Sequence, residues 1–388
     1  MRLLIAGGGT GGHIYPALAV ARSLRASPAD PEIAWLGGRR GLEASLVPAA
    51  GIPFRRLAVR SLRSTDRSVH LVLDPAWLAV SVPQATAILA RRRPAAIFTT
   101  GGYAAIPVIL AARGLRIPVV MWDGNVIPGR SVRATARLVA AVAVSSAATC
   151  ATLDLPAGRC FETGTPIREL AGIDPLAARD RFGVPAGDRL LLIFGGSQAV
   201  KRFNAAVAGA LARLVERVHV VHVTGDAGYA AALAGREALP AAVRDRYRPY
   251  PFLRAEMTDA LVAADLIVGR AGSSTLAEAT ALGRPLVVVP YPHAAGHQRA
   301  NARPLVEAGA ARLIEYADFD ADALVAAAGI LDDPAAHNAM AAASRALGRP
   351  AAAAAVAELV LAAAERRPLP EAAAIVRLAR GHAASGSR

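Results

Sequence analysis

A glycine-rich run, Gly7-Gly8-Gly9-Thr10-Gly11-Gly12, follows a short apolar segment and precedes a helical pattern, with His13 directly after it. The run has the G-x-G-x-x-G spacing that lets backbone N–H groups and a helix N-terminus approach an anion. The positive end of a helix dipole favours the neutral imidazole, so His13 is predicted to act as a general base. A histidine that only caps or packs the helix is the alternative.

The same glycine run is compatible with a dinucleotide site. Enzymes of that class usually carry an acidic residue at the end of the second strand, where it binds the ribose. Here that segment ends Leu36-Gly37-Gly38-Arg39, which disfavours NAD. Arg39 and Arg40 keep an NADP site open as an interpretation.

Two more loops join a strand to a helix in the second half of the chain. Gly195-Gly196-Ser197-Gln198 offers N–H groups and a hydroxyl to a phosphate oxygen. The run from Gly269 to Glu278 ends a strand and starts a helix, with Ser and Thr as natural caps. Glu278 either completes a capping box or accepts hydrogen bonds from two ribose hydroxyls. Two glycine loops facing one cleft suggest a pyrophosphate ligand.

The residues indicate no metal site. The close Asp-x-Asp run, Asp318-Phe319-Asp320-Ala321-Asp322, lies just before a helical pattern and is predicted to cap it. Neither a metal nor another cofactor is expected.

The pattern of short apolar runs and helical stretches predicts an α/β fold made of two Rossmann-like doubly wound domains. The second half repeats the plan of the first, and sheets of this kind bind ligands beyond the carboxyl ends of their strands, so the chemistry is expected in an interdomain cleft. We predict domains at 1–165 and 166–365, and a partly helical or disordered tail at 366–388. The predicted strands cover residues 3–6, 33–36, 95–99, 118–122, 139–144, 190–194, 218–224, 266–269 and 286–290.

The composition suits two aliphatic cores, because 54% of the 388 residues are hydrophobic and only 5% are aromatic. The formal net charge of +14 would attract nucleic acid, an anionic membrane or an acidic substrate, and no nucleic-acid motif accompanies it. Cys150 and Cys160 are too few for a disulfide framework, which fits a reducing cytosol. The N-terminus is not that of a signal peptide.

The apolar stretch from His70 to Leu89 contains Asp74, Pro75 and Pro83, so it is not expected to span a membrane. It could lie on an anionic leaflet, because apolar and basic residues occur together there. A core helix with solvated arginines is the alternative. The apolar residues are Trp77, Leu78, Val80 and Val82, and the basic ones are Arg55, Arg56, Arg60, Arg63, Arg67 and Arg91 to Arg93.

As a set, and in the same order, several motifs resemble those of the MurG family over about residues 1–350. They are Gly9 to His13, Gly101-Gly102-Tyr103, Gly164 to Arg168, Gly195 to Gln198, Arg270 to Glu278, and His297 to Ala302. The resemblance implies a GT-B fold and an inverting transfer of N-acetylglucosamine from UDP-N-acetylglucosamine to undecaprenyl-diphosphate-MurNAc-pentapeptide (lipid I), giving lipid II. It also implies a peripheral protein at the cytoplasmic face of the membrane, with an acceptor and membrane-facing first domain and a donor-binding second domain.

The resemblance assigns site residues by matching motifs. His13 matches the proposed base, Leu253 would pack by the uracil, Glu278 would bind the ribose and Gln298 the sugar. The other substrate-binding matches are Thr10, Gly11, Gly12, Tyr103, Asn125, Arg168, Ser197, Gln198, Ser273, Ser274, Thr275, Leu276 and Ala277.

Two segments depart from the family pattern. Trp122-Asp123-Gly124-Asn125 stands where the family typically reads His-Glu-Gln-Asn, and Gln198-Ala199-Val200 where Gln-Gly-Ala is usual. The first departure favours a related transferase that acts on another lipid or a secondary metabolite as an alternative. An NADP oxidoreductase and a non-catalytic subunit that binds a sugar nucleotide are further alternatives.

Overall fold

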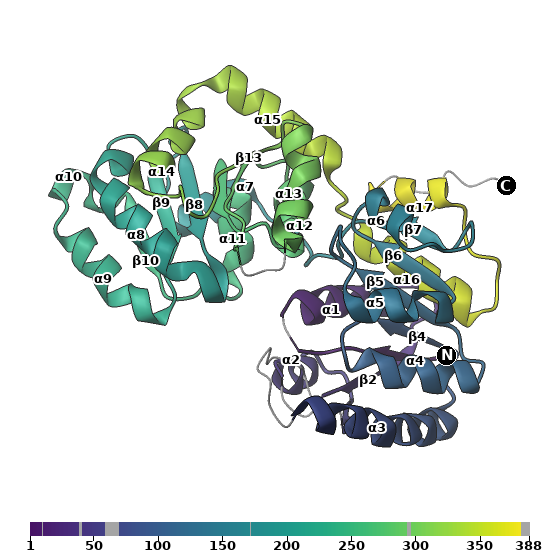
Figure 1. Cartoon of the computed structure of the whole chain (residues 1–388). Coiled ribbons are helices and arrows are strands. Elements are labelled where there is room, and N and C mark those ends of the chain that lie inside the picture. Colours follow the sequence, from purple (N-terminus) through teal and green to yellow (C-terminus); the bar gives the residue numbers. More distant parts are fainter. Residues whose placement is uncertain (10, 39–40, 59–69, 171, 293–295, 382–388) are drawn as a thin grey trace. The chain divides into compact units, whose positions relative to one another are not determined.

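The computed structural model describes residues 1–388 apart from 10, 39–40, 59–69, 171, 293–295 and 382–388. The chain forms two compact units (Figure 1). Unit 1 comprises residues 1–168 and 349–388, and unit 2 comprises residues 169–348.

Unit 1 is built on a seven-stranded parallel sheet in the order β3-β2-β1-β4-β5-β6-β7. The central strands are short apolar runs buried on both faces, as parallel sheets covered by helices require. Neighbours of β1 on its two sides are β2 and β4, so the strand order reverses there. The strands are β1 (Arg2–Ala6), β2 (Glu32–Gly37), β3 (Phe54–Arg56), β4 (Ala96–Thr99), β5 (Val119–Asp123), β6 (Ala141–Val144) and β7 (Cys160–Glu162).

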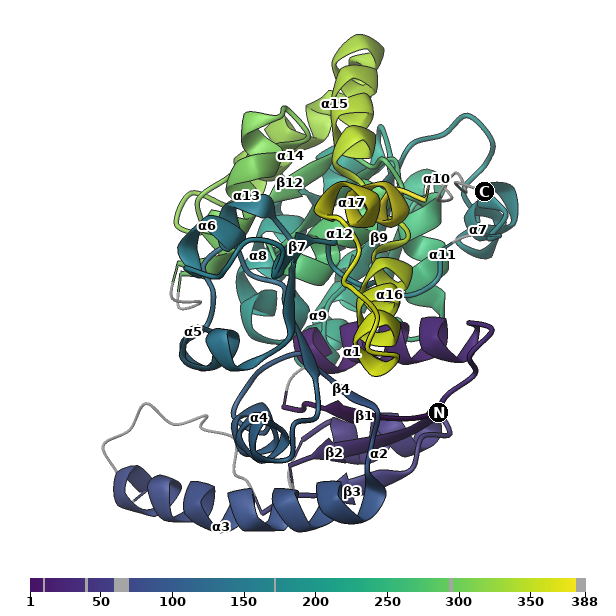
Figure 2. The same cartoon turned by 90° about the vertical axis from the view of Figure 1, so that its right-hand side faces the viewer.

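Alternate residues of these strands face two separate cores. Leu3 and Ile5 face the core formed with α1, α2, α16 and α17, whereas Leu4 and Ala6 face α3, α4 and α5. Figure 2 shows α1 and α16 on one side of the sheet and α3 on the other. The helices of unit 1 are α1 (Gly11–Arg25), α2 (Glu43–Ala49), α3 (His70–Arg92), α4 (Ala105–Gly114), α5 (Arg130–Thr135), η1 (Ala136–Leu138), α6 (Ala147–Thr152), α16 (Ala352–Ala364) and α17 (Ala372–Ala379).

The C-terminal helices belong to unit 1 and not to unit 2. This corrects the predicted domain boundary at residue 365. Helix α16 packs on α1 and on the strands β4 and β5, and the yellow helices α16 and α17 lie among the elements of unit 1 in Figure 1. Nine of the 13 residues of α16 are buried. An Ala/Val/Leu helix of this kind has to cover an apolar surface, and the face of α1 offers one.

Unit 2 repeats the plan with a six-stranded parallel sheet in the order β10-β9-β8-β11-β12-β13. Its strands are β8 (Leu190–Phe194), β9 (His219–Val223), β10 (Tyr247–Tyr250), β11 (Leu266–Gly269), β12 (Leu286–Val288) and β13 (Ala311–Leu313). Both sheets therefore have the doubly wound strand order that the sequence predicts, and the two-domain α/β fold is confirmed.

Helices cover both faces of the unit 2 sheet. One core contains α7 (Pro175–Arg181), α11 (Glu256–Ala263), α12 (Ser273–Ala281) and α13 (His297–Glu307). The other contains α8 (Gly196–Val215), α9 (Asp226–Glu237), α10 (Ala241–Arg244), α14 (Ala321–Ala328), η2 (Gly329–Asp332) and α15 (Pro334–Leu347). Asp320 accepts a hydrogen bond from the Ala323 N–H at 2.9 Å, so the predicted cap of α14 is confirmed.

Cys150 and Cys160 form a disulfide, contrary to the expectation from the sequence. Helix α6 carries Cys150 and packs beside β7, which begins at Cys160, so the two Cα atoms lie 5.7 Å apart. This separation is ordinary for a disulfide. Two cysteines are too few for a framework, but a single bond needs only this adjacency.

Within the described residues, one segment is long and apolar enough to cross a membrane, Pro334–Ala364. It consists of α15 in unit 2 and α16 in unit 1, and the chain leaves the helical conformation between them. More than half of its apolar 18-residue window is buried inside the protein. These features are those of core helices.

Candidate functional site

The first glycine loop rests on a buried carboxylate. Glu43, only 1% exposed, accepts hydrogen bonds from the N–H groups of Gly9 at 2.9 Å and Gly38 at 3.1 Å. A Cβ atom on Gly8 or Gly41 would collide with this carboxylate. The loop thus needs glycine because the backbone closes tightly over Glu43, and Gly9 itself has a φ of +106°.

Glu43 is not among the residues predicted from the sequence. A ribose-binding acid is expected at the end of the second strand, whereas Glu43 opens the following helix, α2. Its role is also different, because it binds the loop backbone. A cluster of glycines on either side of one glutamate is the signal that could have identified it.

His13 lies in the first turn of α1, next to the end of β4. Its Nδ1 atom is 2.8 Å from the carbonyl oxygen of Thr100, which follows β4. A carbonyl oxygen only accepts hydrogen bonds, so Nδ1 carries the proton and donates it. The neutral ring then has Nε2 unprotonated, and this nitrogen can accept a proton from a substrate.

The segment Gly101-Gly102-Tyr103 lies beside the glycine loop. Gly101 and Gly102 have φ values of +74° and +80°, which favour glycine. A Cβ atom on Gly102 would lie 3.9 Å from the carbonyl oxygen of Gly8, so the two loops approach closely. Tyr103 is 43% exposed at this edge of the sheet, where a ligand can reach it. Gly11 and Gly12 lie in the first turn of α1, and Thr10 is outside the described residues.

The end of β5 contributes Asp123, which is 5% exposed. Its carboxylate accepts hydrogen bonds from the N–H groups of Asn125 at 3.0 Å and Gly129 at 3.2 Å. Burial raises the pKa of Asp123 above its ordinary value of 3.8, while these hydrogen bonds and the nearby charge of His13 act in the opposite direction. Asp123 therefore shapes the loop that carries Asn125 and lies within electrostatic reach of His13.

Trp122, the residue that departs most from the family pattern, does not face a ligand site. It is 1% exposed, and its indole Nε1–H donates to the carbonyl oxygen of Gly164 at 3.0 Å. The substitution therefore replaces a polar family residue with a core side chain that ties β5 to the end of β7. Arg168, four residues beyond Gly164, lies with its Cζ 6.0 Å from the ring centre of Tyr15 on α1.

In unit 2, the side chain of Arg270 lies over the second glycine loop. A Cβ atom on Gly196 would collide with the guanidinium of Arg270, and Gly196 has a φ of +61°. Burial lowers the pKa of Arg270, whose Cζ lies 6.0 Å from the ring centre of Tyr291. No ion pair found among the described residues involves Arg270, so this half-buried cation can interact with an anion.

Arg270 begins the motif from Arg270 to Glu278, but it is not among the site residues predicted from the sequence. Nothing in its spacing shows that its side chain folds back over Gly196, 74 positions earlier in the chain. Ser197 and Gln198 lie in the first turn of α8, and their side chains are outside the described part of the structure.

Helix α12 begins at the same sheet edge. Gly272 is its N-cap and no side chain caps it, so the alternative of a capping box is wrong. Ser273, Ser274, Thr275 and Ala277 are half-buried in its first turns, and Leu276 and Glu278 are buried. The burial of Glu278 places its carboxylate at the same edge of the sheet as the first turn of α12.

Gln298 and Leu253 complete the predicted set. The amide oxygen of Gln298, in the first turn of α13, accepts a hydrogen bond from the Tyr291 N–H at 2.8 Å. Its amide nitrogen is then the atom that can donate to a sugar hydroxyl. Leu253 is half-buried against the α11–α12 core. Among the described residues, no group of three or more His, Cys, Asp or Glu side chains could hold a metal ion.

Comparisons with known proteins show which chains this one resembles. The chain matches the glycosyltransferase family 28 N-terminal domain over residues 3–144 and the glycosyltransferase family 28 C-terminal domain over residues 190–358. It is 37% identical, over 90% of its length and 95% of the relative's, to the UDP-N-acetylglucosamine--N-acetylmuramyl-(pentapeptide) pyrophosphoryl-undecaprenol N-acetylglucosamine transferase of Desulforudis audaxviator strain MP104C.

Solved structures give the same result. The crystal structure of Acinetobacter baumannii MurG matches with a TM-score of 0.75 and 27% identity, covering 93% of this chain and 99% of that one. A UDP-N-acetylglucosamine 2-epimerase matches with a TM-score of 0.68 at 17% identity, covering 96% of this chain and 98% of that one. The second likeness shows the fold alone.

Proposed function

Because this chain belongs to glycosyltransferase family 28 and, within it, to the MurG family, we propose that it transfers N-acetylglucosamine from UDP-N-acetylglucosamine to lipid I, giving lipid II. The observation that carries the proposal is the hydrogen bond from His13 Nδ1 to Thr100, because it leaves Nε2 as a base.

The proposed reaction is a single displacement at the anomeric carbon. The acceptor hydroxyl oxygen attacks that carbon, the bond to the UDP oxygen breaks, and the configuration inverts. The hydroxyl proton moves to His13 Nε2. The charge that develops on UDP is stabilised by the Arg270 guanidinium and by the N–H groups at the start of α8 and α12.

The remaining residues have proposed positioning roles. Glu278 binds the ribose, the Gln298 amide nitrogen binds the sugar, and Leu253 packs against the uracil. Burial of Glu278 and the half-burial of Leu253 at one sheet edge support these roles. Tyr103, Asn125 and Arg168 are assigned to substrate contacts because they match family motifs, and all three belong to unit 1 with His13.

His13→Asn is the sharpest test of the base. An asparagine amide can still donate to the Thr100 carbonyl, but it cannot accept the substrate proton. With UDP-N-acetylglucosamine and a short-chain lipid I analogue, we expect the variant to keep its melting temperature and to lose about 10²- to 10⁴-fold in turnover, measured as glycosylated lipid and released UDP.

Arg22→Ala, at the exposed end of α1, serves as the control and is expected to retain full turnover. Turnover of His13→Asn close to that of the unchanged protein would refute the base assignment. UDP binding without transfer to the lipid I analogue in the unchanged protein would refute the acceptor.

One observation favours a second acceptor class as the alternative. Trp122 is a core side chain where the family typically has histidine, so the polar side chain that is usual at this position is missing. A related transferase acting on another lipid or a secondary metabolite would give product in an acceptor screen but not with the lipid I analogue. A non-catalytic subunit would give none.

An NADP oxidoreductase is disfavoured by Glu43. The Gly9 N–H, which a dinucleotide pyrophosphate would need, already donates to this carboxylate, and the carboxylate's negative charge opposes a second anion beside it. NADPH is therefore not expected to bind in a fluorescence titration.

We also propose that the protein is peripheral at the cytoplasmic face of the cell membrane, with α3 of unit 1 against the anionic leaflet. Val80 on α3 is 57% exposed. A hollow of about 760 Å³ at the end of α3 is lined by Arg55, Arg56, Arg91 and Arg92. Apolar and basic groups on one helix are what an interfacial helix requires. Trp77 and Leu78 have side chains outside the described residues.

A further inference from the structure

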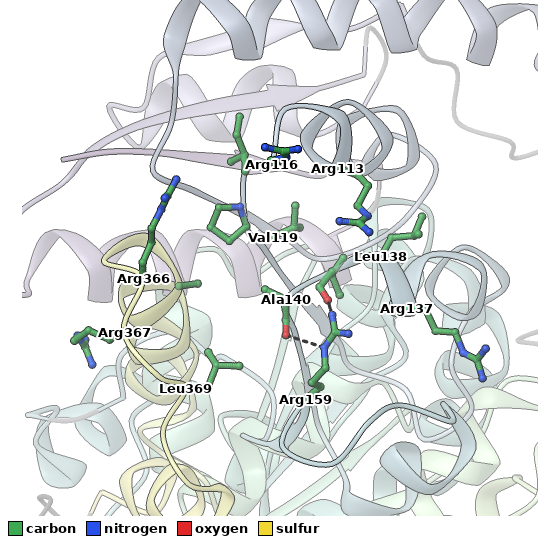
Figure 3. A pocket seen from close by; sticks show the side chains of 14 residues that line it. Arg113, Arg116, Val119, Arg137, Leu138, Ala140, Arg159, Arg366, Arg367 and Leu369 are labelled. Atoms are coloured by element: carbon green, nitrogen blue, oxygen red, sulfur yellow. Dashed lines mark hydrogen bonds between the residues drawn. The ribbon is translucent and has the colours of Figure 1, made fainter.

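A second basic pocket lies at the amino ends of β5 and β6, with a volume of about 610 Å³ (Figure 3). Val119, the first residue of β5, forms part of its wall, whereas Asp123 ends the same strand at the candidate active site. A strand rises about 3.3 Å per residue, so about 13 Å of sheet separates the two. The pocket is therefore distinct from the candidate active site, and its size suits a small molecule.

Positive charge dominates the lining, which contains no acidic residue. Arg137 forms an ion pair with Asp154, and Arg367 forms ion pairs with Glu358 and Glu365. The other four arginines have no carboxylate partner among the described residues. The six lining arginines are Arg113, Arg116, Arg137, Arg159, Arg366 and Arg367.

The four arginines without a carboxylate partner come from separate parts of the chain. In Figure 3, Arg113 from the end of α4 and Arg159 from the start of β7 point toward one another. Arg159 is fixed in the wall because its Nε–H donates to the Ala140 carbonyl at 3.2 Å, and it also donates to the Val139 carbonyl. Guanidinium groups gathered in one place without carboxylates repel one another, which is electrostatically unfavourable. A bound anion would remove this repulsion.

The backbone supplies an independent observation. Arg116 follows α4 and Arg366 follows α16, both with a φ of +56°. These positions just beyond a helix favour glycine, because a Cβ atom makes the left-handed conformation unfavourable. Both nevertheless carry arginine and both line the pocket. Arg93, with a φ of +45° after α3, has the same conformation outside the pocket and is a matched control.

We propose that this pocket binds a phosphate-bearing anion that also has an apolar body. Guanidinium groups match phosphate oxygens in charge and in paired hydrogen-bond geometry. Ile117, Leu138 and Leu369 in the lining supply an apolar wall for the remainder of the ligand. A nucleoside diphosphate and an anionic lipid headgroup share this chemistry. The proposal does not depend on the transferase activity.

ADP is the soluble probe, titrated calorimetrically into the full chain carrying Arg270→Ala, which removes the guanidinium over the Gly196 loop of unit 2 and leaves the pocket lining intact. We expect saturable binding, weakened about 10-fold or more in Arg116→Gly/Arg366→Gly, because each change removes a charge-assisted hydrogen bond. Glycine also relieves both positive φ angles, so the variant is expected to melt no lower than the unchanged protein. Arg93→Gly is expected to leave the affinity for ADP unchanged.

Flotation with phosphatidylglycerol vesicles is the second experiment, and it distinguishes a lipid headgroup from a soluble nucleotide. Weaker ADP binding in the pocket variant, with unchanged vesicle binding, assigns a soluble ligand. Weaker vesicle binding in that variant, but not in Arg22→Ser/Arg312→Ser, which removes the same charge from exposed positions outside the pocket, assigns a lipid headgroup. Wild-type behaviour of the pocket variant in both experiments would overturn the proposal.

Discussion

Asp123 is a buried acid whose charge is only partly compensated by its two backbone hydrogen bonds. Since burial raises its pKa in the folded protein, the folded state holds the Asp123 proton more tightly than the unfolded chain does. Stability contributed by this proton is present below the ordinary pKa of 3.8 and is lost as the pH rises through the raised folded value.

Replacing Asp123 with asparagine should remove this pH dependence. We expect the free energy of unfolding of the unchanged protein, relative to Asp123→Asn, to fall as the pH rises from about 4, by at most about 1.4 kcal/mol per pH unit. Urea unfolding across pH 4–8 measures it. Parallel curves for the two proteins would contradict the prediction.

Candidate site residues could be predicted where their position in a sequence motif also determines which groups lie around them. His13 follows from its position after a glycine loop, and the structure adds its hydrogen bond to Thr100. Glu43 and Arg270 were not predicted as site residues, because each acts on a loop distant from it in the chain. Side-chain direction across such distances is a property of the tertiary fold.

Among the elements, α6 links the disulfide to the loop that carries Asn125. Ser145 and Thr149 donate hydrogen bonds to the carbonyl oxygens of Gly124 at 2.9 Å and Asn125 at 3.2 Å. Cys150 lies one residue beyond Thr149 and is bonded to Cys160. The disulfide therefore holds α6 in the position from which it supports this loop.

We expect Cys150→Ser to lower the free energy of unfolding by about 2–3 kcal/mol, because the bond closes a short loop in the unfolded chain. Urea unfolding with and without dithiothreitol measures the effect. The reductant should destabilise the unchanged protein by the same amount and leave Cys150→Ser unaffected. A reductant effect of equal size in both proteins would show that it does not act through this bond.

The strands that the sequence did not predict are β3, β7, β10 and β13, which are the four edges of the two sheets. Edge strands are buried less completely, so their residues lack the continuous apolar run of a central strand. Strand β3 is Phe-Arg-Arg, and β10 contains Pro249, which edge strands tolerate. The central strands, by contrast, follow from their composition alone.

For the whole molecule, the net charge of +14 makes association with an anionic membrane depend on salt. We expect Arg91→Ser/Arg92→Ser to weaken binding to phosphatidylglycerol vesicles, and binding of the unchanged protein to fall as salt shortens the screening length below about 10 Å. Co-sedimentation measures both.

The control is Arg22→Ser/Arg312→Ser, which removes the same charge from exposed positions outside the α3 hollow. Equal weakening in both double variants would mean that total charge, and not α3, determines membrane binding.

The placement of α16 against α1 also determines when each unit can complete its fold during translation. A ribosome releases the whole of unit 2 before residues 352–364 emerge, so unit 2 can complete its core while the chain is still growing. The sheet of unit 1, although synthesised first, has one apolar face only partly covered, by α1 and α2, until translation is nearly finished. During that interval the nascent chain exposes the surface that chaperones bind, and a message truncated before codon 352 would yield a protein with that face permanently open.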